Sequence, residues 1–225
     1  MNKLESIYNY KTIIFDCDGV VLNSNKVKTQ AFYNTALAFG QAAAERLVKY
    51  HVERGGISRY KKFQWFIDNL NKEDLAQSKD QPNLDNLLSS YAAEVHKGLR
   101  NCQIAEGLTE LREKTKDSIW LIVSGGDQAE LRELFAERDI AQFFDGGIFG
   151  SPDSKEVIMS REREQGNIKS PAVFVGDSQY DYTAVKSVGD IDFIFVTDWS
   201  EFDEYEQFFE EKESVTILDN VGCIA

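Results

Sequence analysis

Short runs of consecutive apolar residues, each ending in a polar or glycine-rich turn, recur along the chain. These runs lack the alternation of a half-exposed strand, which is typical of strands covered on both faces in a parallel sheet. Helical stretches at residues 128–138 and 180–187 follow two of them. The pattern predicts an α/β fold with a Rossmann-like parallel sheet flanked by helices, whose loops at the carboxyl ends of the strands converge on one crevice. The strands are expected at residues 12–16, 118–123, 172–175, 192–196 and 214–218.

The stretch between the first two predicted strands, about a hundred residues, is too long for an ordinary crossover between strands. It shows no strand-like alternation and is interrupted by glycines and a proline. We therefore expect an all-helical cap domain at residues 23–102, inserted into an α/β core domain formed by residues 1–22 and 103–225. Hinges are expected near residues 22–24 and 102–106. The cap helices are predicted at residues 26–39, 42–51, 58–70 and 84–100.

Composition narrows the possible partners. The 225 residues carry a formal net charge of −13 at pH 7, which disfavours nucleic acid and anionic membranes because both would be repelled. An anionic substrate therefore requires a metal ion or a local cluster of positive charge. Three widely spaced cysteines support neither a disulfide framework nor a zinc site, and no apolar run is long enough to cross a bilayer. These features predict a cytoplasmic protein, while its oligomeric state stays open.

Two carboxylates one residue apart end the first predicted strand, in the sequence Asp16-Cys17-Asp18-Gly19-Val20. Like charges this close repel and raise each other's pKa, so a cation or a reaction is expected to offset the cost. Residues i and i+2 of an extended strand point to the same side, which places Asp16 and Asp18 together and turns Cys17 into the core. Gly19 allows the chain to turn sharply away. The pair marks a candidate active site.

The loops at the other strand ends supply groups that suit a phosphate. Carboxylate oxygens without soft ligands favour Mg²⁺. A serine hydroxyl followed by glycines leaves backbone N–H groups free to hold phosphate oxygens, and a lysine adds positive charge. With that charge in place, one acid can attack as nucleophile while the other transfers protons. These loop residues are Ser124 with Gly125 and Gly126, Lys155, Asp177 and Asp181.

The ordered set of these motifs resembles the haloacid dehalogenase-like superfamily, in the branch with a helical cap after the first strand, which includes phosphoglycolate phosphatases and beta-phosphoglucomutases. The resemblance implies that Asp16 is the nucleophile and Asp18 the general acid and base. It also implies that Ser124, Gly125 and Lys155 bind phosphate. The implied Mg²⁺ ligands are Asp16, the backbone carbonyl of Asp18, and Asp177, with Asp181 supporting the metal or Lys155.

Two segments depart from the pattern of the family. Many relatives follow the lysine with proline, whereas Glu156 follows Lys155 here. Residues 23–25, Asn-Ser-Asn, replace a more frequent acidic-Ser-acidic sequence, which affects the hinge and the substrate entrance more than the chemistry.

A basic cluster at residues 54–62 joins two predicted cap helices through a glycine turn. In capped relatives the equivalent loop reaches over the active site, so Arg54, Gly55 and Arg59 are candidates for contacts with the leaving group. The alternative is a solvated run of charges. The two histidines, His51 and His96, have no partner at ligand spacing and are expected to be structural.

The leading hypothesis is a Mg²⁺-dependent phosphatase that hydrolyses a small phosphorylated metabolite, a sugar phosphate or a phosphoglycolate-like compound, through an aspartyl-phosphate. A phosphomutase of the beta-phosphoglucomutase type would use the same acids and is the first alternative. A non-catalytic binding or regulatory module is the second. The expected partner is a small-molecule phosphate ester.

Overall fold

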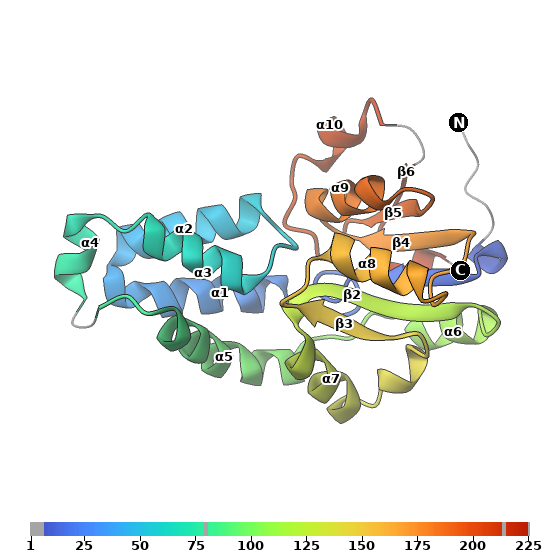
Figure 1. Ribbon diagram of the computed structural model, residues 1–225, viewed down its shortest axis with the longest axis horizontal. Coiled ribbons are helices and arrows are strands. Elements are labelled where there is room, and N and C mark those ends of the chain that lie inside the picture. Colours follow the sequence, from blue (N-terminus) through green and yellow to red (C-terminus); the bar gives the residue numbers. More distant parts are fainter. Residues whose placement is uncertain (1–6, 79–80, 213–214, 225) are drawn as a thin grey trace.

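A single six-stranded parallel sheet forms the centre of the part of the chain that the computed structural model describes, residues 7–78, 81–212 and 215–224 (Figure 1). The strand order is β3-β2-β1-β4-β5-β6, which places β1 beside both β2 and β4. The carboxyl ends of these three central strands therefore meet. The strands are β1 (Thr12–Phe15), β2 (Ile119–Asp127), β3 (Gly147–Ser151), β4 (Ala172–Gly176), β5 (Asp192–Val196) and β6 (Val215–Leu218).

Helices cover both faces of the sheet, as the unbroken apolar runs predict. Ile13 and Phe15 pack into one hydrophobic cluster with α6 and α7, whereas Ile14 packs into the opposite cluster with α8 and α9. This two-sided burial confirms the predicted α/β class. The helices are α6 (Leu108–Lys114), α7 (Gln128–Glu137), α8 (Lys155–Glu164) and α9 (Gln179–Val188).

One strand of the core is missing from the elements that the sequence pattern predicts, and the C-terminal region adds a short helix. The edge strand β3 is absent from the prediction, because glycines at 146, 147 and 150 interrupt its apolar residues. Near the C-terminus, α10 (Tyr205–Phe209) is short, yet Phe209 is buried against the sheet. The predicted strand at 214–218 corresponds to β6, and Ser214 lies outside the described residues.

Five helices follow β1 and form what we call the helical insertion. It has its own hydrophobic cluster, in which the Phe32 ring lies 5.0 Å from Phe63 and 4.5 Å from Tyr91. In Figure 1 it projects from the end of the sheet that carries the loops after the strands. No helix of the described residues is long and apolar enough to span a membrane. The insertion comprises α1 (Asn25–Ala36), α2 (Gln41–Glu53), α3 (Arg59–Asp68), α4 (Lys72–Gln77) and α5 (Leu84–Asn101).

The two segments that join the helical insertion to the sheet lie against each other. The Asn23 N–H donates to the Gln103 carbonyl at 2.9 Å, and the Ala105 N–H donates to the Val21 carbonyl at 2.9 Å. These segments coincide with the positions where hinges are predicted. Short 3₁₀ helices complete the described chain at Ile7–Asn9, Leu37–Phe39, Ala141–Phe143 and Val221–Ile224.

Candidate active site

Three carboxylates from the loops after β1 and β4 converge at the end of the sheet. Asp16, Asp177 and Asp181 are each at most 5% exposed, and one oxygen of each lies within 4.8 Å of the others. The parallel pairing of β1 with β4 brings these loops together. The structure thus collects acids that are separated by more than 150 positions in the sequence, as the convergence of strand ends predicts.

Gly19 makes room for this cluster. Its φ of +74° lies in the left-handed region, and a Cβ there would come within 2.0 Å of the Asp177 Oδ2 atom. Any side chain at position 19 would therefore push Asp177 away from Asp16. The turn after the paired acids is required by the site as well as by the backbone.

Burial and mutual repulsion raise the pKa values of two of these acids. Burial is the main cause that raises the pKa of Asp16 to about 7, and the charges of Asp181 and Asp18 add to it against the opposing effect of Lys155. Burial, followed by the charge of Asp16, raises the pKa of Asp177 well above its usual value. A bound cation would relieve this repulsion, and the all-oxygen donor set fits Mg²⁺.

Lys155, at the start of α8, supplies a positive charge to the cluster and is 1% exposed. It forms ion pairs with Asp181 and, at 3.0 Å, with Asp16. Burial opposes its charge, but these two acids raise the pKa of the amine, so Lys155 stays protonated. The other Asp181 oxygen accepts from the Ser178 hydroxyl at 2.6 Å. Asp181 therefore contacts Lys155 directly, as expected, and its oxygens are already engaged.

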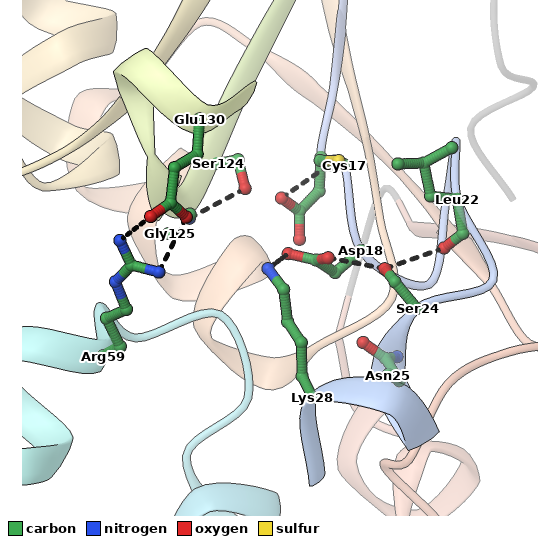
Figure 2. A network of polar contacts seen from close by, with 12 residues as sticks. Cys17, Asp18, Leu22, Ser24, Asn25, Lys28, Arg59, Ser124, Gly125 and Glu130 are labelled. Carbon is green, nitrogen blue, oxygen red and sulfur yellow. Dashed lines mark hydrogen bonds and ion pairs between the residues drawn. The ribbon is translucent and has the colours of Figure 1, made fainter. Parts of the chain in front are cut away.

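Asp18 faces Lys28 of the helical insertion (Figure 2). Its carboxylate forms an ion pair with Lys28 of α1 and accepts from the Ser24 hydroxyl at 2.5 Å. Burial opposes ionisation, but Lys28 and Ser24 lower the pKa of Asp18. Sequence reasoning overlooked Lys28. Its spacing of one helical turn from Ser24 is the signal that would have placed both side chains on one face.

The carboxyl-terminal part of β2, which we call the Ser124 loop, holds the predicted phosphate-binding residues. Ser124 is 1% exposed, and its hydroxyl oxygen accepts from the Gly126 N–H at 3.0 Å, which leaves the hydroxyl hydrogen free to donate. The Gly125 carbonyl accepts from the Ser151 hydroxyl at 2.8 Å, which fixes the loop against β3. The arrangement suits a phosphate group bound at Ser124 and Gly125.

The turn between α2 and α3 lies directly on this loop. A Cβ at Gly125 would come within 2.2 Å of the Gly56 carbonyl, and one at Gly55 within 3.3 Å of the Ser178 side chain. The Arg59 guanidinium donates to both carboxylate oxygens of Glu130 at 2.7 and 2.8 Å, a contact visible in Figure 2. Arg59 therefore ties the helical insertion to α7.

A cavity of about 260 Å³ lies between the sheet end and the helical insertion. The three predicted insertion residues, Arg54, Gly55 and Arg59, all line it, and Arg54 stacks over the Tyr50 ring at 4.9 Å. His51 also lines the cavity, although its sequence context suggested only a structural role. The residues that reach it from the sheet end include Asp16, Asp18, Gly125 and Asp177.

The family model for haloacid dehalogenase-like hydrolases matches residues 10–189, and the chain belongs to this family. It is therefore a hydrolase by family, with the fold that the sequence motifs predicted. None of the curated proteins matches the chain.

Solved structures share the fold. A predicted phosphoglycolate phosphatase from Haemophilus somnus is 18% identical with a TM-score of 0.74, and 97% of each chain is covered. A predicted phosphatase from Clostridium acetobutylicum is 16% identical with a TM-score of 0.66, covering 93% of this chain and 94% of that one. CbbY from Rhodobacter sphaeroides, solved with xylulose-(1,5)bisphosphate, is 13% identical with a TM-score of 0.67 and 95% coverage of both chains.

Proposed function

We propose that this protein is a Mg²⁺-dependent phosphatase that hydrolyses a small phosphorylated metabolite through an aspartyl-phosphate on Asp16. The observation that carries the proposal is the buried Asp16, placed between the Lys155 ammonium and the Asp177 carboxylate at one end of the cavity. The hydrolase family supports water as the final acceptor, in preference to the sugar acceptor of a phosphomutase. The complete set of acids argues against a non-catalytic module.

Asp16, Asp177 and the backbone carbonyl of Asp18 would hold Mg²⁺. The bound ion would neutralise the charge of the phosphate and of the carboxylates around it. Two features support this assignment. Both carboxyl groups have raised pKa values in a buried site, and the oxygens of Asp181 are engaged by Lys155 and Ser178.

The chain's own residues then divide the reaction. A carboxylate oxygen of Asp16 attacks phosphorus and the ester P–O bond breaks, while Ser124, Gly125 and Lys155 hold the phosphate oxygens. Asp18 gives a proton to the leaving alkoxide. It later accepts a proton from the water that attacks the phosphorus, which frees Asp16 and inorganic phosphate. In the free protein the ion pair with Lys28 keeps Asp18 ionised, so Asp18 takes up a proton from solvent when substrate displaces that ion pair and then donates it to the leaving group.

The helical insertion would act as the cap, with residues 23–102 forming one domain over the core. Its turn already lies against the Ser124 loop, and the cavity of about 260 Å³ is suited to a small ligand. CbbY binds a sugar bisphosphate in the same fold, which supports a small phosphate ester as the partner.

The test is hydrolysis of p-nitrophenyl phosphate with Mg²⁺ and with EDTA. The wild-type protein is expected to turn over only with the metal, and Asp16→Asn to lose the activity. The control is Asp117→Asn, an exposed acid that lines no part of the cavity. Retention of Mg²⁺-dependent hydrolysis by Asp16→Asn would overturn the proposal.

A further inference from the structure

Lys62, in α3, is a buried amine with no part in the reaction described above. Its residue is 2% exposed, and it lines the same cavity as Asp16 and Asp18. Lysine is rarely buried this fully without a charged partner. Its surroundings therefore indicate what the position is built to bind.

Hydrogen bonds from the helical insertion hold the amine in place. The Lys62 Nζ atom donates to His51 Nδ1 at 2.6 Å and to the His51 carbonyl at 3.3 Å. His51 Nε2 lies 3.1 Å from the Thr29 hydroxyl, which in turn donates to Glu201 at 2.9 Å. When Lys62 is protonated it can only donate, so His51 then accepts through Nδ1 and carries its hydrogen on Nε2, which faces Thr29. An ammonium has three N–H bonds, so one is left for a ligand in the cavity.

Lys62 differs from two other cations that line the cavity, Lys28 and Arg59. Lys28 pairs with Asp18, and Arg59 pairs with Glu130. Among the described residues, no carboxylate lies within ion-pair distance of Lys62, whose Nζ atom lies 5.6 Å from the centroid of the Phe32 ring. The titratable groups that face it or line the cavity beside it are His51 of α2, Lys28 of α1, Tyr91 of α5, Asp18 after β1, Lys155 of α8 and Glu201 after β5.

In the free protein this environment disfavours the protonated form of Lys62. Burial, followed by the charge of Lys28, lowers the pKa of Lys62 to about 7. Burial and the charge of Lys62 hold the pKa of His51 well below its usual value, so His51 is neutral. An anion placed against Lys62 would reverse the balance and draw a proton onto the amine.

We propose that Lys62, positioned by His51, binds a second anionic group of the substrate, so that the preferred substrates are phosphorylated hydroxy acids rather than neutral polyol phosphates. The inference rests on the proposed phosphatase function, because it assumes that the phosphate occupies the Ser124 and Lys155 end of the site. The small cavity favours a carboxylate only a few bonds from the ester oxygen. Lys62 would then be the specificity-determining contact of the helical insertion.

Ligand affinities measured in a variant that does not turn over substrate test this role of Lys62 directly. Asp16→Asn protein with Mg²⁺ is titrated calorimetrically with phosphoglycolate and with 2-hydroxyethyl phosphate, which differ only in a carboxylate against a hydroxymethyl group. Phosphoglycolate is expected to bind at least about tenfold more tightly, as a charge-assisted contact in a buried site requires. At pH 8, titrations in buffers of different ionisation heat should show proton uptake with phosphoglycolate alone.

Variants assign the preference to Lys62. In the Asp16→Asn background, Lys62→Gln should weaken the binding of phosphoglycolate alone and so bring the two affinities within about twofold of each other. Lys62→Arg should keep most of the preference. Unchanged affinity for 2-hydroxyethyl phosphate shows that the variant is folded. The matched control is Lys61→Gln, which removes the same charge from the adjacent exposed position.

Three results would overturn the inference: equal affinities in the parent, a preference that survives Lys62→Gln, or a loss of both ligands in that variant. Each leaves the phosphatase proposal standing if p-nitrophenyl phosphate is hydrolysed. Conversely, absence of hydrolysis with an intact binding preference would remove the proposed function alone.

Discussion

The two walls of the cavity are built on different principles. Behind the wall formed by the sheet end, Asp16 and Asp181 both form ion pairs with Lys155. On the wall formed by the helical insertion, Lys62 has a neutral histidine as its partner. The first wall is suited to chemistry common to a family of hydrolases, and the second to the choice of substrate.

Removing the proposed metal ligand Asp177 from the sheet wall should give the largest effect. Asp177→Asn is expected to lower kcat by about 10²–10³, because transition-state charge loses its main stabilising partner. It should also remove the Mg²⁺-dependent rise in Tm. The measurements are steady-state kinetics and thermal unfolding with and without Mg²⁺. A variant that keeps both the activity and the Mg²⁺ response would show that Asp177 is not a ligand.

The same site predicts the pH dependence of stability. The folded-state pKa values of Asp16, about 7, and of Asp177 are raised above their unfolded values. Their ionisation therefore disfavours folding, so the contribution of these two acids to the free energy of unfolding of the metal-free protein should fall between about pH 4 and pH 8. Mg²⁺ should accordingly raise Tm more at pH 8 than at pH 5. Each kcal/mol corresponds to about 2–4 °C in a chain of this size.

A smaller effect is expected from removing the ion pair between Asp18 on the sheet wall and Lys28 of the helical insertion. Lys28→Gln should lower kcat for an alkyl phosphate by about tenfold, since Asp18 loses the partner that orients it. It should also move the descending, high-pH limb of the profile upward, because Lys28 lowers the pKa of Asp18. Lys26→Gln, an exposed position two residues away, is the control. An unchanged pH profile would show that Lys28 does not act on Asp18 during turnover.

The smallest effect should come from the contact that ties the helical insertion to α7. Glu130→Gln removes the closer charged partner of Arg59, which also lies 3.7 Å from an Asp127 oxygen, and is expected to raise KM about three- to tenfold, since Arg59 is largely buried. Glu137→Gln is a matched control on the same helix. It breaks an exposed pair with Arg100 of α5, away from the cavity, and should change KM less than twofold. Equal effects of the two variants would contradict a role specific to the cavity.

The same difference between the walls decides how much the sequence could predict. The strand ends follow from apolar runs and short motifs, so the convergence of Asp16, Asp177 and Lys155 could be expected before the structure was known. Edge strand β3 could not, because its glycines disguise the pattern. The partners of Lys62 depend on how α1, α2 and α3 pack, and that packing is not encoded in local spacing. The roles of the individual site residues remain predictions that the variants above test.

Direct detection of the phosphorylated enzyme tests the central claim. Wild-type protein is mixed with Mg²⁺ and an excess of substrate, quenched in acid within the first turnover, and its peptides are analysed by mass spectrometry. We expect one phosphoryl group on the peptide that contains Asp16, and none in Asp16→Asn protein. Turnover with no phosphorylated peptide, or with the phosphoryl group on another residue, would contradict the account.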